Sequence, residues 1–186
     1  IGFVKFITGE LWRPNNNLFV IFPMIIGSLY ITGGAIAVGV PIGIFTAVFL
    51  AKYCPSGLYK IIKPATELLA GIPSVVYGFF GLMVIVPAVR MIFGTNRTDG
   101  MSILTASFLL GIMILPTIIG VTETSIRAVN SSYFEGALAL GATKEASIFR
   151  CVIPAAKSGI LAGVVLGIGR AIGETMAVVM IAGNQP

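Results

Sequence analysis

Apolar residues gather in four long stretches along the chain, with shorter polar segments between them. The stretches cover about residues 24–51, 65–93, 101–121 and 158–182. Each is long enough to cross the hydrocarbon core of a membrane, which takes a helix of about 20 residues. Prolines and glycines inside them are tolerated, because neighbouring helices in a membrane satisfy the freed backbone groups. The pattern predicts an all-α fold, a polytopic transmembrane helical bundle.

The composition supports membrane lipid as the surroundings of the chain. Of the 186 residues, 56% are hydrophobic and 10% are charged, whereas soluble domains have about 25% charged residues. The net charge is +5, but the basic residues are scattered between apolar stretches and form no stripe that could follow phosphates. We therefore expect no nucleic acid partner.

The connecting segments predict an orientation. Segments 52–64 and 122–157 are the more basic, so the positive-inside rule assigns them to the cytoplasmic side. The basic residues expected there are Lys52, Lys60, Lys63, Arg127, Lys144, Arg150 and Lys157, and those expected on the opposite side are Lys5, Arg13, Arg90 and Arg97. The first stretch would then run from outside to inside.

Residues 1–23 differ from the apolar stretches. Phe3, Phe6 and Trp12 lie among charged residues and asparagines, and such aromatic side chains are typical of the membrane–water interface. We expect an external interfacial segment that follows the end of an upstream span. The alternative is a disordered stub.

The sequence offers little for catalysis or metal binding. It has no histidine, and its two cysteines, Cys54 and Cys151, are far apart. A metal site, a disulfide framework and a Ser/His/Asp arrangement are therefore not expected.

The acidic residues leave one enzymatic alternative. Glu67, Glu123 or Glu174 could act as an acid or base, but no span carries a pair of carboxylates. Glu123 and Arg127 are four residues apart at the end of the third stretch, where we expect a solvated or interfacial ion pair. Glu67 precedes Pro73, which predicts a bend near a gate or a tolerated kink.

Two charged residues lie within the fourth stretch, in "GIGRAIGETMAVVM". An arginine near the centre of a bilayer costs about 3 kcal/mol on insertion scales. Glu174 follows Arg170 by one helical turn, so we expect both on the same face. They either pair with each other to hold helices together, or they line a water-accessible path in which Arg170 meets an anion.

Glycines repeat at four-residue spacing in the same stretch. Small residues at this spacing allow helix backbones to approach closely. The candidates for helix packing are Gly159, Gly163, Gly167, Gly169 and Gly173. The spacing of residues 167–173 is one residue too long for a dinucleotide-binding loop, and no strand precedes it.

The segment 122–157 is too regular for a plain connection. From Ser132 to Ile153 it predicts two helical pieces, with a bend at Gly141 and an end at Pro154. Such an element could present a small protrusion to another protein. It could also lie on the membrane surface as an amphipathic helix without a partner.

Within this segment, "EGALALGATKEASIFRCVIP" resembles the EAA loop of ABC importer permeases. The positions that fit the motif are Glu135, Ala137, Gly141 and Pro154. Gly136 stands where the motif has alanine, which weakens the first helical turn. The resemblance implies a cytoplasmic coupling helix, formed by Glu135, Gly136, Ala137, Gly141 and Pro154, that docks into the ATP-hydrolysing subunit.

The stretches "ELLAGIPSVVYGFFGL", "GIGRAIGETMAVVMIAGN" and "FITGELWRP" resemble the PstC-type permease subunit of bacterial phosphate importers. The resemblance implies a type I ABC importer permease fold with six spans. Residues 1–23 would then follow a missing first span, and residues 24–186 would form the permease domain, truncated before the last span.

The resemblance also implies a function and partners. The chain would translocate inorganic phosphate across the bacterial inner membrane, together with a second homologous permease, two ATP-binding cassette subunits and an extracytoplasmic phosphate-binding protein. It has no GxxxxGK[ST] motif, so ATP and Mg would be bound by the partner subunits and no cofactor by this chain. Alternatives are a permease for sulfate or molybdate, or the sister PstA-type subunit.

Overall fold

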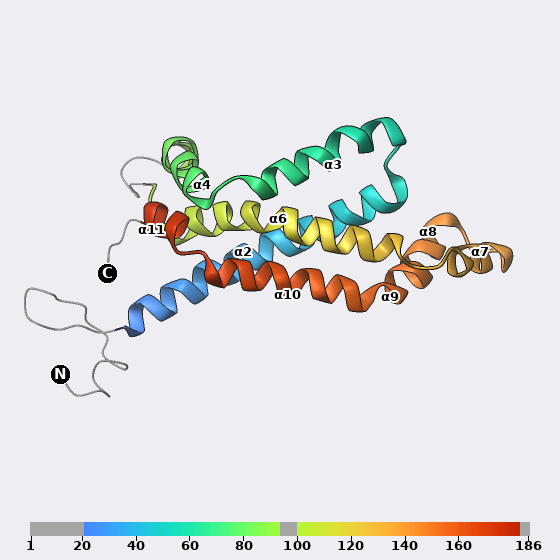
Figure 1. Ribbon diagram of the computed structural model, residues 1–186. Helices are drawn as coiled ribbons and strands as arrows, with labels where there is room; N and C mark the ends of the chain where they lie inside the picture. Colours follow the sequence, from blue (N-terminus) through green and yellow to red (C-terminus); the bar gives the residue numbers. More distant parts are fainter. Residues whose placement is uncertain (1–20, 94–99, 183–186) are drawn as a thin grey trace, which may run out of the picture. The chain divides into compact units, whose positions relative to one another are not determined.

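A computed structural model describes residues 21–93 and 100–182 (Figure 1). These residues form helices and short connections, without strands, and the prediction of an all-α fold is confirmed. Residues 1–20 of the predicted interfacial segment 1–23 lie outside the described residues, as do residues 94–99 and 183–186.

The long helices follow the apolar stretches. α2 (Phe22–Val48) continues as a π-helical turn, η2 (Phe49–Tyr53), and the two form a run of 32 residues. This run exceeds the length of about 20 residues that a bilayer needs. α6 (Ile103–Arg127) and α10 (Lys157–Gly173) are the other long helices.

The predicted span 65–93 is divided in the structure. α3 (Ser56–Gly71) ends before Ile72 and Pro73, and a second run follows as α4 (Ser74–Phe80), η3 (Gly81–Ile85) and α5 (Val86–Phe93). The break has a local cause, because a residue that precedes proline is pushed out of the helical region, and Ile72 has an extended backbone with ψ 128°. Much of the predicted loop 52–64 is therefore helical.

Three described runs are long and apolar enough to cross a membrane: Phe22–Tyr53, Ser74–Ile92 and Ile103–Arg127. The run Lys144–Ala155 and α10 form a bent pair, with an angle of 68° between them, that would count as a fourth. The predicted fourth span 158–182 corresponds to α10 and α11 (Met176–Ala182), with a break at residues 174–175.

The chain divides into two compact units. The first unit contains the described residues of 1–36, 73–111 and 172–186, and the second contains 37–72 and 112–171. In the first unit, α4 packs against α11. The two helices approach closely at Gly78, where an added Cβ atom would lie 3.1 Å from Ala177 Cα.

The second unit has a buried apolar core that includes the segment after the bend. The core residues are Val48, Ile126, Ile148, Val152 and Ala156. Ile148 and Val152 belong to η4 (Ile148–Val152), which is packed in this way against the ends of α2 and α6.

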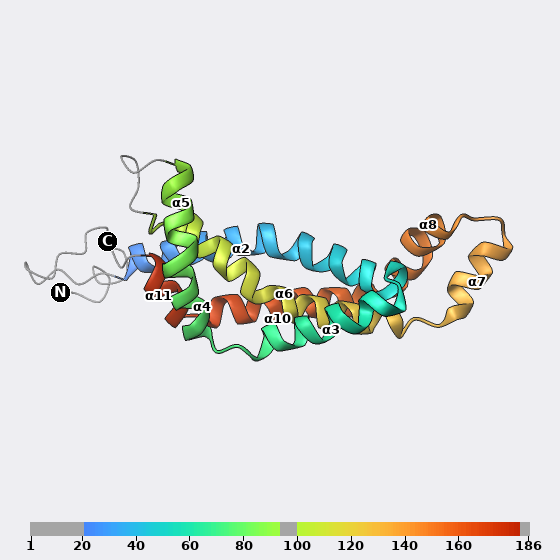
Figure 2. The ribbon, with the colours of Figure 1, turned by 90° about the horizontal axis from the view of Figure 1, so that it is seen from above.

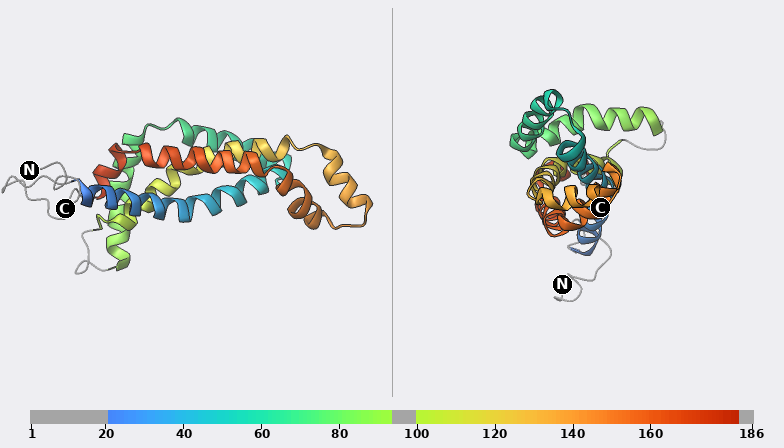
Figure 3. Two further views of the ribbon diagram at one scale, coloured as in Figure 1. Left: turned by 90° about the horizontal axis from the view of Figure 1, so that it is seen from below. Right: turned by 90° about the vertical axis from the view of Figure 1, so that its right-hand side faces the viewer.

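The segment 131–155 forms the helix–bend–helix that the sequence predicts. α7 (Ser131–Ala139) is followed by α8 (Lys144–Ser147), η4 and α9 (Ile153–Ala155). Gly141 lies between the two pieces with φ 86°, a left-handed conformation that favours glycine. Figures 2 and 3 show α7 and α8 projecting beyond the neighbouring ends of α6 and α10 in this unit.

Three of the five candidate packing glycines lie against α6. Gly159 approaches Ser125, Gly163 approaches Thr122 and Val121, and Gly167 approaches Ile118. No described atom lies within 4 Å of a Cβ added at Gly169 or Gly173. The close approach of α10 to α6 is therefore concentrated in the first ten or so residues of α10.

The difference in surroundings between Gly159 and Gly169 allows two alanine substitutions to be compared. Gly159→Ala places a methyl group on the Ser125 side chain, whose Oγ donates to the Val121 carbonyl oxygen at 2.7 Å. Gly169→Ala adds the same methyl group in open space. Both gain about 1 kcal/mol of helix propensity, but overpacking costs about 1–3 kcal/mol.

We expect Gly159→Ala to unfold at lower temperature than Gly169→Ala, by about 1–2 kcal/mol in the free energy of unfolding. Thermal unfolding of the complete protein in detergent micelles measures the difference. Equal melting temperatures for the two variants would mean that α10 and α6 are not in close contact at Gly159.

Candidate functional site

Arg170 lies in the last turn of α10, beside α6. Its Nη1 donates a hydrogen bond to Thr117 Oγ1 at 3.2 Å, and both residues are partly buried. A threonine hydroxyl is neutral, and this bond occupies one of the five donor hydrogens of a guanidinium. The position therefore suits a planar cation that can bind an oxyanion with two parallel hydrogen bonds.

Glu174 lies beyond the end of α10 and has a different partner. Its Oε1 accepts a hydrogen bond from the backbone N–H of Ala177 at 3.1 Å, and so satisfies one of the free N–H groups at the start of α11. The sequence predicts Glu174 on the same helical face as Arg170. That prediction is wrong because the helix ends at Gly173.

The EAA-loop residues lie in a different part of the second unit. Glu135, Gly136, Gly141 and Pro154 are exposed, and Ala137 is partly buried. They precede α10, whereas Arg170 lies in its last turn, about 20 Å along the axis at 1.5 Å per residue. The structure therefore separates two candidate sites, one for an ion and one for a partner.

Both pieces of the EAA loop begin with a side-chain cap. Asn130 Oδ1 accepts a hydrogen bond from the Ser132 N–H at 3.0 Å before α7, and Thr143 Oγ1 accepts one from the Ala146 N–H at 3.2 Å before α8. Such caps fix where a helix starts. Leu140 lies between the two pieces with 91% of its surface exposed, so the bend presents an apolar side chain outward.

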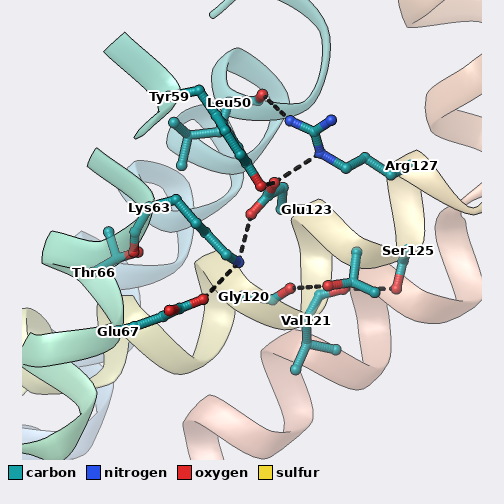
Figure 4. A network of polar contacts seen from close by, with 11 residues as sticks. Leu50, Tyr59, Lys63, Thr66, Glu67, Gly120, Val121, Glu123, Ser125 and Arg127 are labelled. Atoms are coloured by element: carbon teal, nitrogen blue, oxygen red, sulfur yellow. Dashed lines mark hydrogen bonds and ion pairs between the residues drawn. The ribbon is translucent and has the colours of Figure 1, made fainter. Parts of the chain in front are cut away.

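A buried carboxylate that sequence reasoning missed joins three elements (Figure 4). Glu123, on α6, is 1% exposed. Its Oε1 accepts hydrogen bonds from Tyr59 Oη and Arg127 Nε, and its Oε2 accepts one from Lys63 Nζ, each at 2.8 Å. Arg127 Nη2 also donates to the Leu50 carbonyl oxygen at 2.8 Å. We call these five residues the Glu123 cluster.

The predicted ion pair of Glu123 and Arg127 is present, with 2.8 Å between Nε and Oε1. The expectation of a solvated or interfacial pair fails for Glu123, which is buried, whereas Arg127 is partly exposed. α3 lies over the carboxylate and supplies Tyr59 and Lys63, whereas the sequence predicts most of this segment as a loop. The available signal was the i, i+4 spacing of Tyr59 and Lys63, which places both on one helical face. Glu67 lies at the edge, 3.8 Å from Lys63 and largely exposed.

The cluster changes the acid–base properties of α3. The hydrogen bond to Glu123 is the main cause that raises the pKa of Tyr59 above its ordinary value. The hydrogen bond to the same carboxylate raises the pKa of Lys63, against the opposing effect of burial. In both residues the folded protein therefore holds the proton more strongly.

Other features of the described residues bear on a metal or anion site. Three or more His, Cys, Asp or Glu side chains do not come together within 21–93 and 100–182. A cavity of about 340 Å³ beside the start of α7 is lined by residues that include Ser125, Asn130, Tyr133 and Gly159. Its lining has no charged side chain, so it does not suit an anion.

Comparison with known proteins identifies the family. Residues 39–186 match the model of the binding-protein-dependent transport system inner membrane component. The chain belongs to this family of inner membrane components of transport systems, and its several apolar helices fit a multi-pass membrane protein.

Individual relatives cover almost all of this chain. It is 39% identical to the probable ABC transporter permease YqgH of Bacillus subtilis, over 97% of this chain and 59% of the relative. It is 38% identical to the phosphate transport system permease PstC of Mesorhizobium japonicum, over 97% of this chain and 60% of that relative. For PstC of Haemophilus influenzae the identity is 34%, over 97% of this chain and 63% of that relative. The chain therefore spans about three fifths of these relatives.

The raised pKa values predict a loss of stability at alkaline pH. A group whose pKa is higher in the folded state stabilises the fold below its unfolded pKa, and this contribution disappears as the pH rises through the folded pKa. For Tyr59 and Lys63 the loss begins above about pH 10.

We expect Glu123→Gln to unfold more easily at pH 8, by about 2 kcal/mol, because it removes hydrogen bonds to a charged acceptor. We also expect a shallower decline in stability between pH 8 and pH 11 than in the unmodified protein. Unfolding in detergent at several pH values measures both. Parallel pH profiles would contradict the account of the cluster.

Proposed function

We propose that this chain is the PstC-type permease subunit of an ATP-driven importer of inorganic phosphate. Arg170 carries the proposal, because a guanidinium in an apolar helix needs an anion or water, and Thr117 offers it a neutral hydroxyl. The names of the relatives from Mesorhizobium japonicum and Haemophilus influenzae, both phosphate transport permeases, support phosphate as the anion.

Arg170 and Glu174 have different roles in the proposed pathway. Arg170 binds phosphate oxygens with two parallel hydrogen bonds, and it stays charged where the dielectric constant is low. Glu174 fixes the start of α11 after the break at residues 174–175. Discontinuous helices are common at the substrate sites of transporters, because they leave backbone groups free near the ion.

The proposed transport cycle needs other subunits. An extracytoplasmic binding protein delivers phosphate to a path between this chain and a second, homologous permease. Two ATP-binding cassette subunits bind ATP and Mg, and their closure moves the EAA loop at α7 and α8. This chain catalyses no reaction itself.

Sulfate and molybdate are the alternative cargoes, since they are also tetrahedral oxyanions that an arginine can bind. The PstA-type sister subunit is the alternative identity. The names of the relatives favour phosphate and the PstC type.

Replacement of Arg170 tests the pathway. We expect Arg170→Ala to reduce phosphate uptake by about 100-fold or more in liposomes that contain the assembled transporter, since a lost charge pair costs about 3 kcal/mol or more. Arg170→Lys keeps the charge but not the planar fork, so we expect an intermediate loss.

The control is Arg90→Ala, which removes an exposed arginine at the end of another span. It should leave uptake unchanged. Normal uptake by both Arg170 variants would exclude this side chain from the pathway. Uptake of sulfate or molybdate in place of phosphate would instead show that the transported anion is one of these.

The EAA loop offers a matched pair of glycines. Gly141→Ala forces an alanine into the left-handed conformation, at a cost of about 1–2 kcal/mol. Gly136→Ala adds a methyl group on α7 with no described atom within 4 Å and improves helix propensity by about 1 kcal/mol.

We expect Gly141→Ala to weaken co-purification with the ATP-binding subunits and to lower phosphate-stimulated ATP hydrolysis. Gly136→Ala should preserve both. If Gly141→Ala couples as well as Gly136→Ala does, the bend at residues 140–141 does not form the docking surface.

A further inference from the structure

α3 is attached to the rest of the second unit by polar contacts together with partly buried apolar ones. None of its 16 residues is fully buried. Tyr59 and Ile62 are partly buried against the apolar group of Ala47, Leu50 and Ile119, and Tyr59 and Lys63 reach the buried carboxylate of Glu123. Because a buried charge that loses its partners is costly, the carboxylate holds the face of α3 that carries both donors.

Arg127 extends this link to the end of η2. Its Nε is held by Glu123, its Nη2 donates to the Leu50 carbonyl oxygen, and its Cζ lies 4.5 Å from the centre of the Tyr59 ring. Carbonyl groups in the last turn of a helix lack partners within the helix. The guanidinium supplies one, and its positive charge suits the negative end of the helix dipole.

η2 in turn contacts the first helix after the bend of the EAA loop. Lys144, on α8, lies over the Tyr53 ring at 5.4 Å from its centre. The core residues Ile148 and Val152 of η4 pack with Val48, next to η2. A continuous series of contacts therefore runs from α8 through Tyr53 and η2 to Arg127, Glu123 and α3. Figure 4 shows its second part, from Leu50 of η2 to Arg127, Glu123 and α3.

We propose that Glu123 is a positioning residue that makes α3 follow the movements of α8. The inference rests on the proposed function in one respect, namely that partner subunits move α7 and α8 during ATP hydrolysis. α3 ends at the Ile72–Pro73 break, where the helix does not continue, so it can turn as a rigid rod about that point. Tyr59 and Lys63, on one face of α3, donate hydrogen bonds to the Glu123 carboxylate. Arg127 donates to Oε1, the oxygen atom that also accepts from Tyr59, and so transmits a displacement of η2 to α3.

Distance measurements between spin labels test this without regard to the cargo. Cys54 and Cys151 are first replaced by serine in the assembled transporter. Label pairs are placed at Ile61→Cys on α3 with Leu161→Cys on α10, and at Glu145→Cys on α8 with Leu161→Cys. Ile61 and Leu161 are 69% and 61% exposed and lie outside the Glu123 cluster.

We expect ATP binding to change both distances in the unmodified transporter. In Glu123→Gln the α8–α10 distance should still change, whereas the α3–α10 distance should stay fixed. An α3 that moves normally with ATP in Glu123→Gln would overturn the proposal. An α3 that stays fixed in the unmodified transporter while α8 moves would also overturn it.

Substitutions of Tyr53 provide a second test of the link between α8 and α3 if the Glu123→Gln transporter does not assemble. Tyr53→Leu removes the aromatic ring under Lys144, whereas Tyr53→Phe keeps it. We expect Tyr53→Leu to reduce the phosphate transported per ATP by about tenfold and Tyr53→Phe to be close to the unmodified protein. Lys60→Met, a change at an exposed lysine of α3, is the matched control and should have no effect.

The Tyr53 and Glu123 substitutions interrupt the same series of contacts, so their effects should not add. Additive losses of phosphate transported per ATP would count against the link between α8 and α3. An equal loss with Tyr53→Phe and Tyr53→Leu would also count against it. A transporter that carries no phosphate but shows the expected label movements would refute the proposed cargo and leave the role of Glu123 supported.

Discussion

A charged side chain in a medium of low dielectric constant must be paired, hydrated or bound to an ion, and this constraint organises the second unit. Glu123 meets the requirement with three donors from two helices. Among the residues that the structure describes, Arg170 meets it only in part, with one bond to a threonine hydroxyl. The first arrangement is closed and suits a structural link. The second leaves donor hydrogens available and suits a transient ligand.

The positions of Arg170 and Glu123 depend on the close packing of α10 against α6. Gly159, Gly163 and Gly167 bring α10 against α6, which carries both Thr117 and Glu123. The same helix thus provides the hydroxyl beside Arg170 and the carboxylate beneath α3. In the proposed importer, a movement of α6 relative to its neighbours would affect the ion site and the coupling end together.

Much of this arrangement was predictable from the sequence. Long apolar stretches predict the helices, and the EAA-loop motif predicts the bend at Gly141, because a positive φ there requires a residue without Cβ. The interruption at Ile72 and Pro73 follows from the proline. The helix of residues 56–71 was harder to predict, since its lysines and its internal Pro64 resemble a loop.

The Glu123 cluster is missed for the same reason, although the spacing of Tyr59 and Lys63 would place both on one face if their segment were taken as a helix. Its contacts join residues about 60 positions apart, and a single sequence contains no signal for such pairing once α3 is taken as a loop. The break after Gly173 was also missed. Its residues, Glu174 and Thr175, have side chains that readily compete for backbone hydrogen bonds, but the apolar pattern continues on both sides of them.

The central claim is that Arg170 lies on a water-filled path for anions, and the reactivity of Thr117→Cys tests it most directly. In an assembled transporter with Cys54 and Cys151 replaced by serine, a negatively charged methanethiosulfonate reagent should modify this cysteine faster than a neutral reagent does. Phosphate should slow the modification. A cysteine at this position that remains unreactive in every nucleotide state, or that phosphate does not protect, would contradict the account.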